Sequence, residues 1–135
     1  MEVAGSEAQS LRIERSEIGD PSTPTDHDLL LNVSVRVGGY SAADQAWIVS
    51  TDWQGFVREL RHLEATRQGE AVLQGASPEE LRLVFAATDN AGHVAVSGHI
   101  GWHRPDGFLQ KLHFGFPFDP GFLRNMLNEL ATFTA

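Results

Sequence analysis

The sequence predicts an α+β domain, in which an antiparallel sheet of about six or seven strands is covered on one face by two amphipathic helices. Short segments in which apolar and polar residues alternate recur along the chain, as in half-buried strands. Two other segments carry apolar residues three and four positions apart, as in amphipathic helices. Turn residues separate the strands of the C-terminal half at hairpin spacing, which predicts a meander there.

The first ten residues are predicted to differ from the rest of the chain. Residues 1–10 are mostly small or acidic and show no periodic pattern, so we expect a disordered acidic tail. Residues 11–135 are expected to form one domain, because a chain of this length can bury a core without disulfide bonds. The first strand is predicted at residues 10–18, and two prolines make residues 19–26 a loop.

The clearest strand pattern lies at residues 29–37, where apolar residues occupy every second position. Two glycines break this strand, and residues 40–49 are predicted to return as the next one. Trp47 is out of phase with the apolar positions of the returning strand, so we predict that it makes a surface contact. Trp53 and Trp102 fall on apolar stripes and are expected in the core.

Two helices are predicted from apolar residues at helical spacing. The first spans residues 52–67 and begins with a capping box, formed by Thr51 and by Gln54 three residues later. Gly69 is expected to stop it. The second helix closes the chain and is predicted to begin at Asp119, which serves as its N-cap before a proline.

The turns of the C-terminal half also predict the register of its strands. Thr88 is expected opposite His93, and Arg104 opposite Phe108, so that partner numbers across each hairpin have a constant sum. Apolar residues then face one another across the strands: Phe85 and Val96, Leu81 and Ile100, Ile100 and Leu112, Val96 and Phe116, Val94 and Phe118. The apolar residues of the last strand are expected to share one buried face: Phe108, Leu112, Phe114, Phe116 and Phe118.

Charge and composition exclude several function classes. Eighteen acidic residues against ten basic ones give a net charge of −8, and there is no basic stripe. Neither a nucleic acid nor an anionic membrane surface is therefore expected as a partner. The absence of cysteine excludes a disulfide scaffold, a thiolate metal site and a cysteine nucleophile. Without a membrane-spanning run or a secretory signal, we expect a cytoplasmic protein.

No catalytic residue, cofactor or metal site is predicted. The sequence lacks a nucleophile elbow and a phosphate-binding loop. The register places His99 and His113 as cross-strand neighbours on the polar face of the sheet, with Lys111 close by. Two imidazoles offer too few ligands for zinc, which takes three or four. These three residues are therefore a candidate surface and not a predicted metal site.

The order of several short segments resembles a known family. These segments are Trp53-x-x-Phe56-x-x-x-Leu60-x-x-Leu63, Gly69-Glu70-Ala71-x-Leu73, Leu81-x-Leu83, Gly92-His93-Val94-x-Val96, and Leu112-x-Phe114-x-Phe116-x-Phe118-Asp119 with Phe122-Leu123. Over about residues 30–133 the chain thus resembles the WapI-type immunity proteins and related actinobacterial domains. The resemblance implies a non-enzymatic α+β domain that binds the toxic C-terminal domain of a secreted polymorphic toxin inside the producing cell.

Acidic residues are the candidates for contact with such a toxin. A nuclease-like toxin domain is basic because it binds phosphate, and an acidic inhibitor can mimic the phosphate charges. We expect the contacts in loops and at the ends of elements. The acidic residues that the sequence places there are Asp44, Asp52, Glu79, Glu80, Asp89 and Asp106.

The residues leave two other functions open. A small-molecule-binding domain, or a subunit of a larger assembly, would show a concave and partly apolar pocket between the sheet and the helices. A hydrolase or metal enzyme would bring a loop carboxylate such as Asp28 together with His99 and His113.

Overall fold

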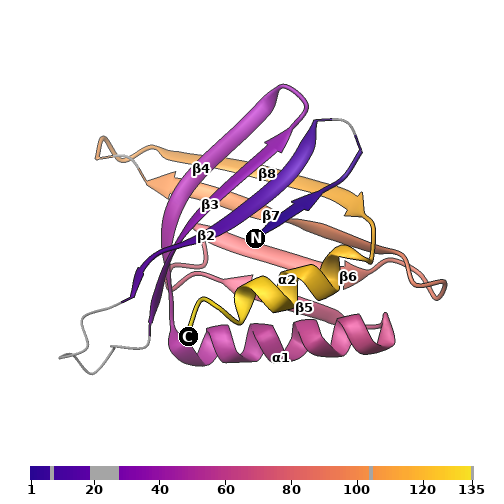
Figure 1. Ribbon diagram of the computed structural model, residues 1–135. Helices are drawn as coiled ribbons and strands as arrows, with labels where there is room; N and C mark the ends of the chain where they lie inside the picture. The colour runs from indigo at the N-terminus through magenta and orange to yellow at the C-terminus, as the bar shows by residue number, and fades with distance from the viewer. Residues whose placement is uncertain (7, 19–27, 104, 135) are drawn as a thin grey trace.

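The structure is a computed structural model that describes residues 1–6, 8–18, 28–103 and 105–134 (Figure 1). It confirms the predicted α+β class, with antiparallel strands and two helices. The elements in chain order are β1 (Glu2–Ala4), β2 (Gln9–Ile18), β3 (Leu29–Val37), β4 (Tyr40–Ile48), α1 (Ser50–Thr66), β5 (Glu70–Gln74), β6 (Leu81–Ala87), β7 (Val94–His103), β8 (Leu109–Phe118) and α2 (Phe122–Leu130).

The strands form two sheets and not the one sheet of six or seven strands that the pattern predicts. β1 to β4 make one four-stranded sheet and β5 to β8 make another, each in chain order. The chain passes through α1 between β4 and β5, so no hairpin joins the two sheets. Alternation along a strand shows which face is buried but not which strands pair across an intervening helix, and this explains the difference.

The predicted register of the C-terminal meander is confirmed. Phe85 pairs with Val96, and Ile100 pairs with both Leu81 and Leu112. The backbone N–H of Thr88 donates to the carbonyl oxygen of His93 at 2.9 Å, which closes the first of the two hairpins as expected. Turn chemistry and a one-sided apolar pattern are sufficient to fix this register.

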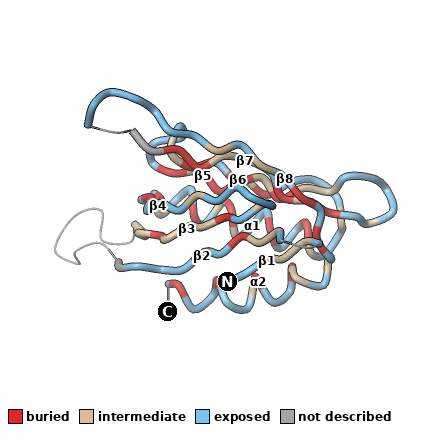
Figure 2. The backbone as a smooth tube through the Cα atoms, turned by 90° about the horizontal axis from the view of Figure 1, so that it is seen from above, coloured by how far each residue is buried: buried red, intermediate tan, exposed pale blue. Residues whose placement is uncertain are grey.

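Both sheets and both helices share one apolar core. α1 packs against β5 and β6, and α2 packs against α1 and β1, so the two helices lie side by side; in Figure 1 α1 runs along the bottom and α2 lies just above it. Figure 2 shows buried positions alternating with exposed ones along the strands. No polar or charged residue is buried within the described part of the chain. The elements are thus held together by apolar burial, at roughly 25 cal/mol per Å².

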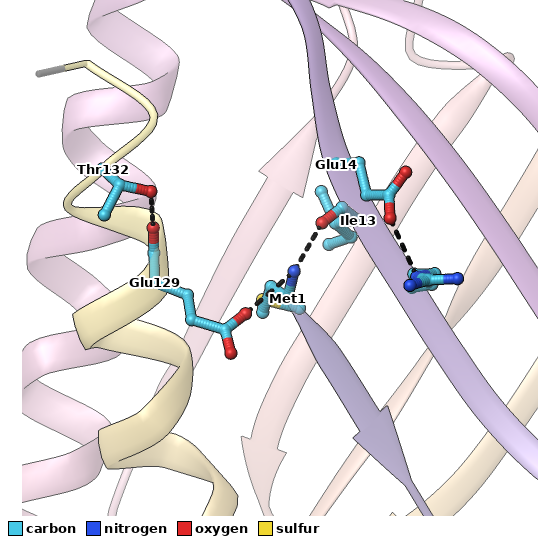
Figure 3. Close-up of polar contacts among 6 residues, drawn as sticks. Met1, Ile13, Glu14, Glu129 and Thr132 are labelled. Atoms are coloured by element: carbon cyan, nitrogen blue, oxygen red, sulfur yellow. Dashed lines mark hydrogen bonds and ion pairs between the residues drawn. The ribbon is translucent and has the colours of Figure 1, made fainter.

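The N-terminal tail expected to be disordered is instead part of this core. β1 pairs antiparallel with β2, Val3 faces Leu11, and both side chains are fully buried. The α-amino group of Met1 donates to the carbonyl oxygen of Ile13 at 2.9 Å (Figure 3). It also forms an ion pair of 2.9 Å with Glu129 of α2. A three-residue strand with one apolar position is too short to leave a periodic signal, so the sequence pattern missed it.

The helix ends differ from the predicted caps. The capping box of Thr51 and Gln54 is wrong, because α1 begins at Ser50 without a side-chain cap from its own first turn. Asp28, which lies before β3, instead accepts a hydrogen bond of 2.9 Å from the N–H of Ser50. At the other end Arg67 takes the left-handed conformation, with φ of 57°, and its N–H donates to the carbonyl oxygen of Leu63.

The start of the second helix was also predicted differently. α2 begins at Phe122, and Asp119 does not cap it with its side chain. The Oδ1 atom of Asp119 accepts from the N–H of Gly121 at 2.7 Å, which makes a local turn before the helix. Its carbonyl oxygen accepts from the N–H of Phe122 at 3.0 Å.

The aromatic face of β8 is only partly buried, which corrects the prediction. Phe116 and Phe118 are buried, Leu112 and Phe114 are half-buried, and Phe108 is 68% exposed. The β7–β8 hairpin projects at the left of Figure 1, so its tip has no opposing sheet to cover it. The predicted loop at 19–26 and the side chain of Trp102 lie outside the described residues.

One glycine in β7 permits a close approach of the neighbouring strand. Gly98 has φ of 147°, and a Cβ atom there would lie 2.0 Å from the carbonyl oxygen of Arg82. We predict that Gly98→Ala lowers the free energy of unfolding by about 3 kcal/mol or more, because backbone strain and a backbone clash add. Urea denaturation measures this loss. Gly39→Ala is the matched control, since a Cβ there meets nothing within 4 Å.

The ion pair between Met1 and Glu129 gives a second prediction about stability. With a free α-amino group at Met1, Glu129→Gln should lower the free energy of unfolding by about 0.5–1 kcal/mol, because Glu129 is 56% exposed and solvent screens the pair. Thermal unfolding at low and at 1 M salt measures it, and salt should diminish the difference. Glu14→Gln, which removes a pair with Arg12 that is exposed on both sides, should change stability less. Equal losses for the two variants would contradict the role given to Met1.

Candidate partner-binding site

Four of the six candidate acidic residues surround the end of β7. Asp44 of β4 lines a hollow together with Gly101 of β7 and Lys111 of β8. The turn that carries Glu79 and Glu80 lies against the same point, since the N–H of Gly101 donates to the carbonyl oxygen of Glu80 at 2.7 Å. Asp106 follows three residues after β7 ends. Long-range packing therefore gathers carboxylates that are far apart in the chain.

The turn at residues 76–80 is held between the two sheets. The N–H of Ala76 donates to the carbonyl oxygen of Trp47 in β4 at 2.8 Å, and the N–H of Glu80 donates to that of Ser77 at 3.0 Å. A Cβ atom on Gly101 would lie 2.6 Å from the carbonyl oxygen of Glu79. The turn comes this close to β7 because glycine occupies position 101.

Large apolar side chains are exposed at the same edge. Trp47 is 43% exposed beside the 76–80 turn, which agrees with the surface contact predicted for it. Phe108 and Leu109 are exposed at the β7–β8 hairpin, 68% and 41% respectively. Figure 1 shows this hairpin and the C-terminal end of β4 on the same side of the molecule. We call this surface the acidic edge and define it by Asp44, Trp47, Glu79, Glu80, Asp106, Phe108 and Leu109.

The other two acidic residues lie elsewhere, and Asp44 is not in a loop. Asp44 occupies the middle of β4, opposite Val33, which corrects the expectation that all six residues lie in loops or at element ends. Asp52 lies in the first turn of α1. Asp89 precedes β7 and Asp106 follows it, so a strand of ten residues, about 30 Å, separates them. The six acidic residues therefore do not lie in one cluster.

Asp89 stabilises the turn between β6 and β7. Its Oδ1 atom accepts from the N–H groups of Ala91 and His93, at 2.8 and 3.3 Å. Its Oδ2 atom lies 2.6 Å from Nδ1 of His93. The hydrogen bond from the His93 side chain is the main cause that lowers the pKa of Asp89 below its usual value, and the bond from Ala91 adds to it.

The polar face of the second sheet carries the predicted histidine pair. His99 lies directly opposite His113, and their ring centroids are 5.3 Å apart. Nε2 of His99 lies 2.9 Å from the carbonyl oxygen of Pro78, so the pair borders the acidic edge. Arg82 lies opposite His99 on β6, which extends the row across three strands. Sequence reasoning missed Arg82, although the same register predicts its position.

The histidine pair is not part of a metal site within the described residues. No group of three histidine, aspartate or glutamate side chains within 1–6, 8–18, 28–103 and 105–134 is placed to hold a metal ion. Asp28, the carboxylate that a hydrolase or metal enzyme would need there, accepts from Ser50 at the start of α1 instead.

A groove lies between α1 and the C-terminal segment. It has a volume of about 560 Å³. Trp53 and Leu130 contribute to its apolar floor, and Arg58 and Arg61 line it from α1. Sequence analysis did not select either arginine as a site residue. The spacing of three residues predicts that Arg58 and Arg61 are neighbours on α1. The opposite wall of the groove cannot be predicted in this way, because its residues lie about 70 positions later in the chain.

At the acidic edge, exposed aromatic side chains of the kind enriched at protein–protein interfaces lie among carboxylates. The chain matches the model of the Immunity protein WapI-like family over residues 2–135. It belongs to this family, as the sequence resemblance indicated. No curated protein matches the chain, and neither does any solved structure. None of the helices in the described ranges is long and apolar enough to span a membrane.

The contact between Asp89 and His93 predicts a pH effect. Because the pKa of Asp89 is lowered by folding, its contribution to stability is complete above about pH 4 and is lost as the pH falls through the lowered pKa. His93→Ala should raise the Asp89 titration midpoint toward its usual value, as followed by carboxyl-carbon NMR. His62→Ala on α1 is the control and should leave that midpoint in place. An unchanged midpoint in His93→Ala would show that the imidazole is not the cause.

Proposed function

We propose that this chain is a non-enzymatic immunity protein that binds a cognate toxin domain in the cytoplasm of the producing cell and neutralises it. Membership of the immunity family supports a toxin as the partner. The observation that carries the proposal is the acidic edge, which combines four carboxylates with three exposed apolar side chains. We propose this edge as the toxin-binding surface, in place of the six scattered acidic residues.

The charge of the edge fits a basic partner. Four carboxylates lie there, and Lys111 is the one lysine that shares the hollow with Asp44. At low ionic strength, where screening is weak, the net charge of −8 also attracts a basic domain over a longer range. A nuclease-like toxin needs a basic cleft to hold phosphate, and carboxylates that enter this cleft occupy the place of the substrate.

The apolar side chains of the edge would supply most of the binding energy. Interface hot spots are enriched in tryptophan and other large side chains that become fully desolvated. The backbone of Trp47 is held by the hydrogen bond from Ala76, so little backbone entropy is lost when this residue docks. Phe108 projects from the hairpin and can enter a pocket of the partner. The charges of the edge then set the association rate, and these side chains set the dissociation rate.

The direct test is coexpression with the toxic C-terminal domain of a polymorphic toxin encoded beside this gene. We expect the chain to restore growth and to form a stable complex whose affinity falls with salt. Neutralising three carboxylates together, with Asp44→Asn, Glu79→Gln and Glu80→Gln, should weaken binding about 10- to 100-fold, mainly through slower association. Trp47→Ala should instead accelerate dissociation, by about 10-fold or more. Surface plasmon resonance separates the two rates.

A control variant with the same change in net charge tests whether the loss of toxin binding arises at the acidic edge. The triple variant Glu2→Gln, Asp52→Asn and Glu70→Gln neutralises exposed acidic residues outside the acidic edge. It should bind within about threefold of the unmodified chain, because charges beyond the Debye length of about 8 Å contribute little at physiological salt. Equal weakening in both triple variants would refute the acidic edge as the binding surface. Failure of the chain to protect against the toxin would refute the immunity function itself.

A further inference from the structure

We infer that the groove between α1 and the C-terminal segment is a binding site for a small amphipathic anion, one that carries an apolar body and a single oxyanion group. The groove has a volume of about 560 Å³, within the range of small-molecule sites, about 300–1,000 Å³. Its lining residues are Leu29, Ser50, Trp53, Gln54, Val57, Arg58, Arg61, Leu130, Ala131 and Thr134. None of them belongs to the acidic edge, so the inference goes beyond the proposed function.

The floor of the groove is apolar and already formed. Trp53 stacks on Phe133, with ring centroids 5.7 Å apart and planes inclined by 5°. Both side chains are buried, which fixes α1 and the C-terminal segment relative to each other. Nη1 of Arg15 donates to the carbonyl oxygen of Phe133 at 2.6 Å and holds the segment from the side of β2. A ligand therefore finds the walls in place and loses little free energy in ordering them.

Two guanidinium groups give the groove a positive rim. Arg58 and Arg61 are exposed, lie three residues apart on α1, and form no ion pair within the described chain. Side chains at this spacing are neighbours on a helix surface. No carboxylate lines the groove, although the protein carries eight more acidic than basic residues. Asp28 is not among the lining residues, and its Oδ1 atom accepts a hydrogen bond from the N–H of Ser50.

The chemistry of the ligand follows from these two parts. Guanidinium groups bind carboxylate, sulfonate and phosphate through paired hydrogen bonds, and they bind most strongly where water is partly excluded. The apolar floor favours a flat or aliphatic body over a free inorganic ion. Gln54 and Thr134 add side chains that can donate to oxygen atoms at the rim. An aromatic or aliphatic acid satisfies all of these features, whereas a neutral apolar molecule leaves the two arginines without a partner.

The test uses 8-anilinonaphthalene-1-sulfonate, an aromatic anion whose fluorescence rises in apolar surroundings. We expect saturable binding at one site of the folded chain. N-phenyl-1-naphthylamine, which has the same apolar body without the sulfonate, should bind at least about 10-fold more weakly. The double variant Arg58→Gln with Arg61→Gln should lose at least about 10-fold in affinity for the sulfonate. Arg58→Lys with Arg61→Lys should retain more of the affinity, because it keeps the charge.

The control variant carries Arg36→Gln and Arg82→Gln, which remove two exposed arginines that do not line the groove. It should bind the sulfonate as the unmodified chain does. Circular dichroism and thermal unfolding confirm that each variant is folded. The inference is overturned if the sulfonate does not bind, if the neutral analogue binds equally well, or if the two double glutamine variants behave alike.

Competition then distinguishes the oxyanion. 2-Naphthoate and 2-naphthyl phosphate share one apolar body and differ in the anionic group. Displacement of the probe by either compound, but not by 2-naphthamide, supports the inference, and the stronger competitor identifies a carboxylate or a phosphate as the natural group. Equal displacement by the amide would overturn it. These measurements need no toxin, so they succeed or fail independently of the immunity function.

Discussion

Burial of one apolar core between two sheets is the constraint on which the rest of the structure depends. Each four-stranded sheet has one apolar face, and that face needs another element to cover it. The two faces and the apolar stripes of both helices meet in one cluster. Because no polar or charged residue of the described chain is buried there, the arrangement rests on shape and apolar area. Phe56 and Phe85, both fully buried, join α1 to the second sheet.

This shared core also determines what lies at the surface. It brings β4 of the first sheet across β7 of the second, which places Asp44 beside Gly101. The chain returns from β5 to β6 at this crossing, so the turn with Glu79 and Glu80 is held against both sheets. The backbone that carries Glu79 and Glu80 is therefore held by hydrogen bonds to both sheets. A preformed surface of this kind loses little entropy when a partner binds.

Sequence reasoning succeeded where the determining contacts are local. Adjacent strands joined by short turns have a register that turn residues and alternation determine, and the pair of His99 and His113 follows from it. The apolar stripe of α1 likewise places Trp53 in the core. These features depend on residues within about fifteen positions of one another. They identify the fold class, the histidine pair and the exposure of Trp47.

The features that sequence reasoning missed depend on residues far apart in the chain. Asp28 replaces a local cap of α1, and Met1 reaches Glu129 across the whole chain. The acidic edge needs the crossing of the two sheets, and the groove needs the C-terminal segment beside α1. No periodic pattern encodes such proximity, since periodicity reports burial within one element only. The same limit explains why six acidic residues were grouped although Asp89 and Asp106 lie at opposite ends of β7.

The fold thus separates two surfaces of different character, the acidic edge proposed to bind a toxin domain and the arginine-lined groove inferred to bind a small anion. The proposed immunity function concerns the first, and its location is the central claim. Hydrogen–deuterium exchange of the chain, alone and in complex with its toxin domain, tests this location most directly. Protection at residues 44–48, 76–80 and 105–111 is the predicted result. Protection confined to the exposed face of β2 and β3, with none at these three segments, would contradict it.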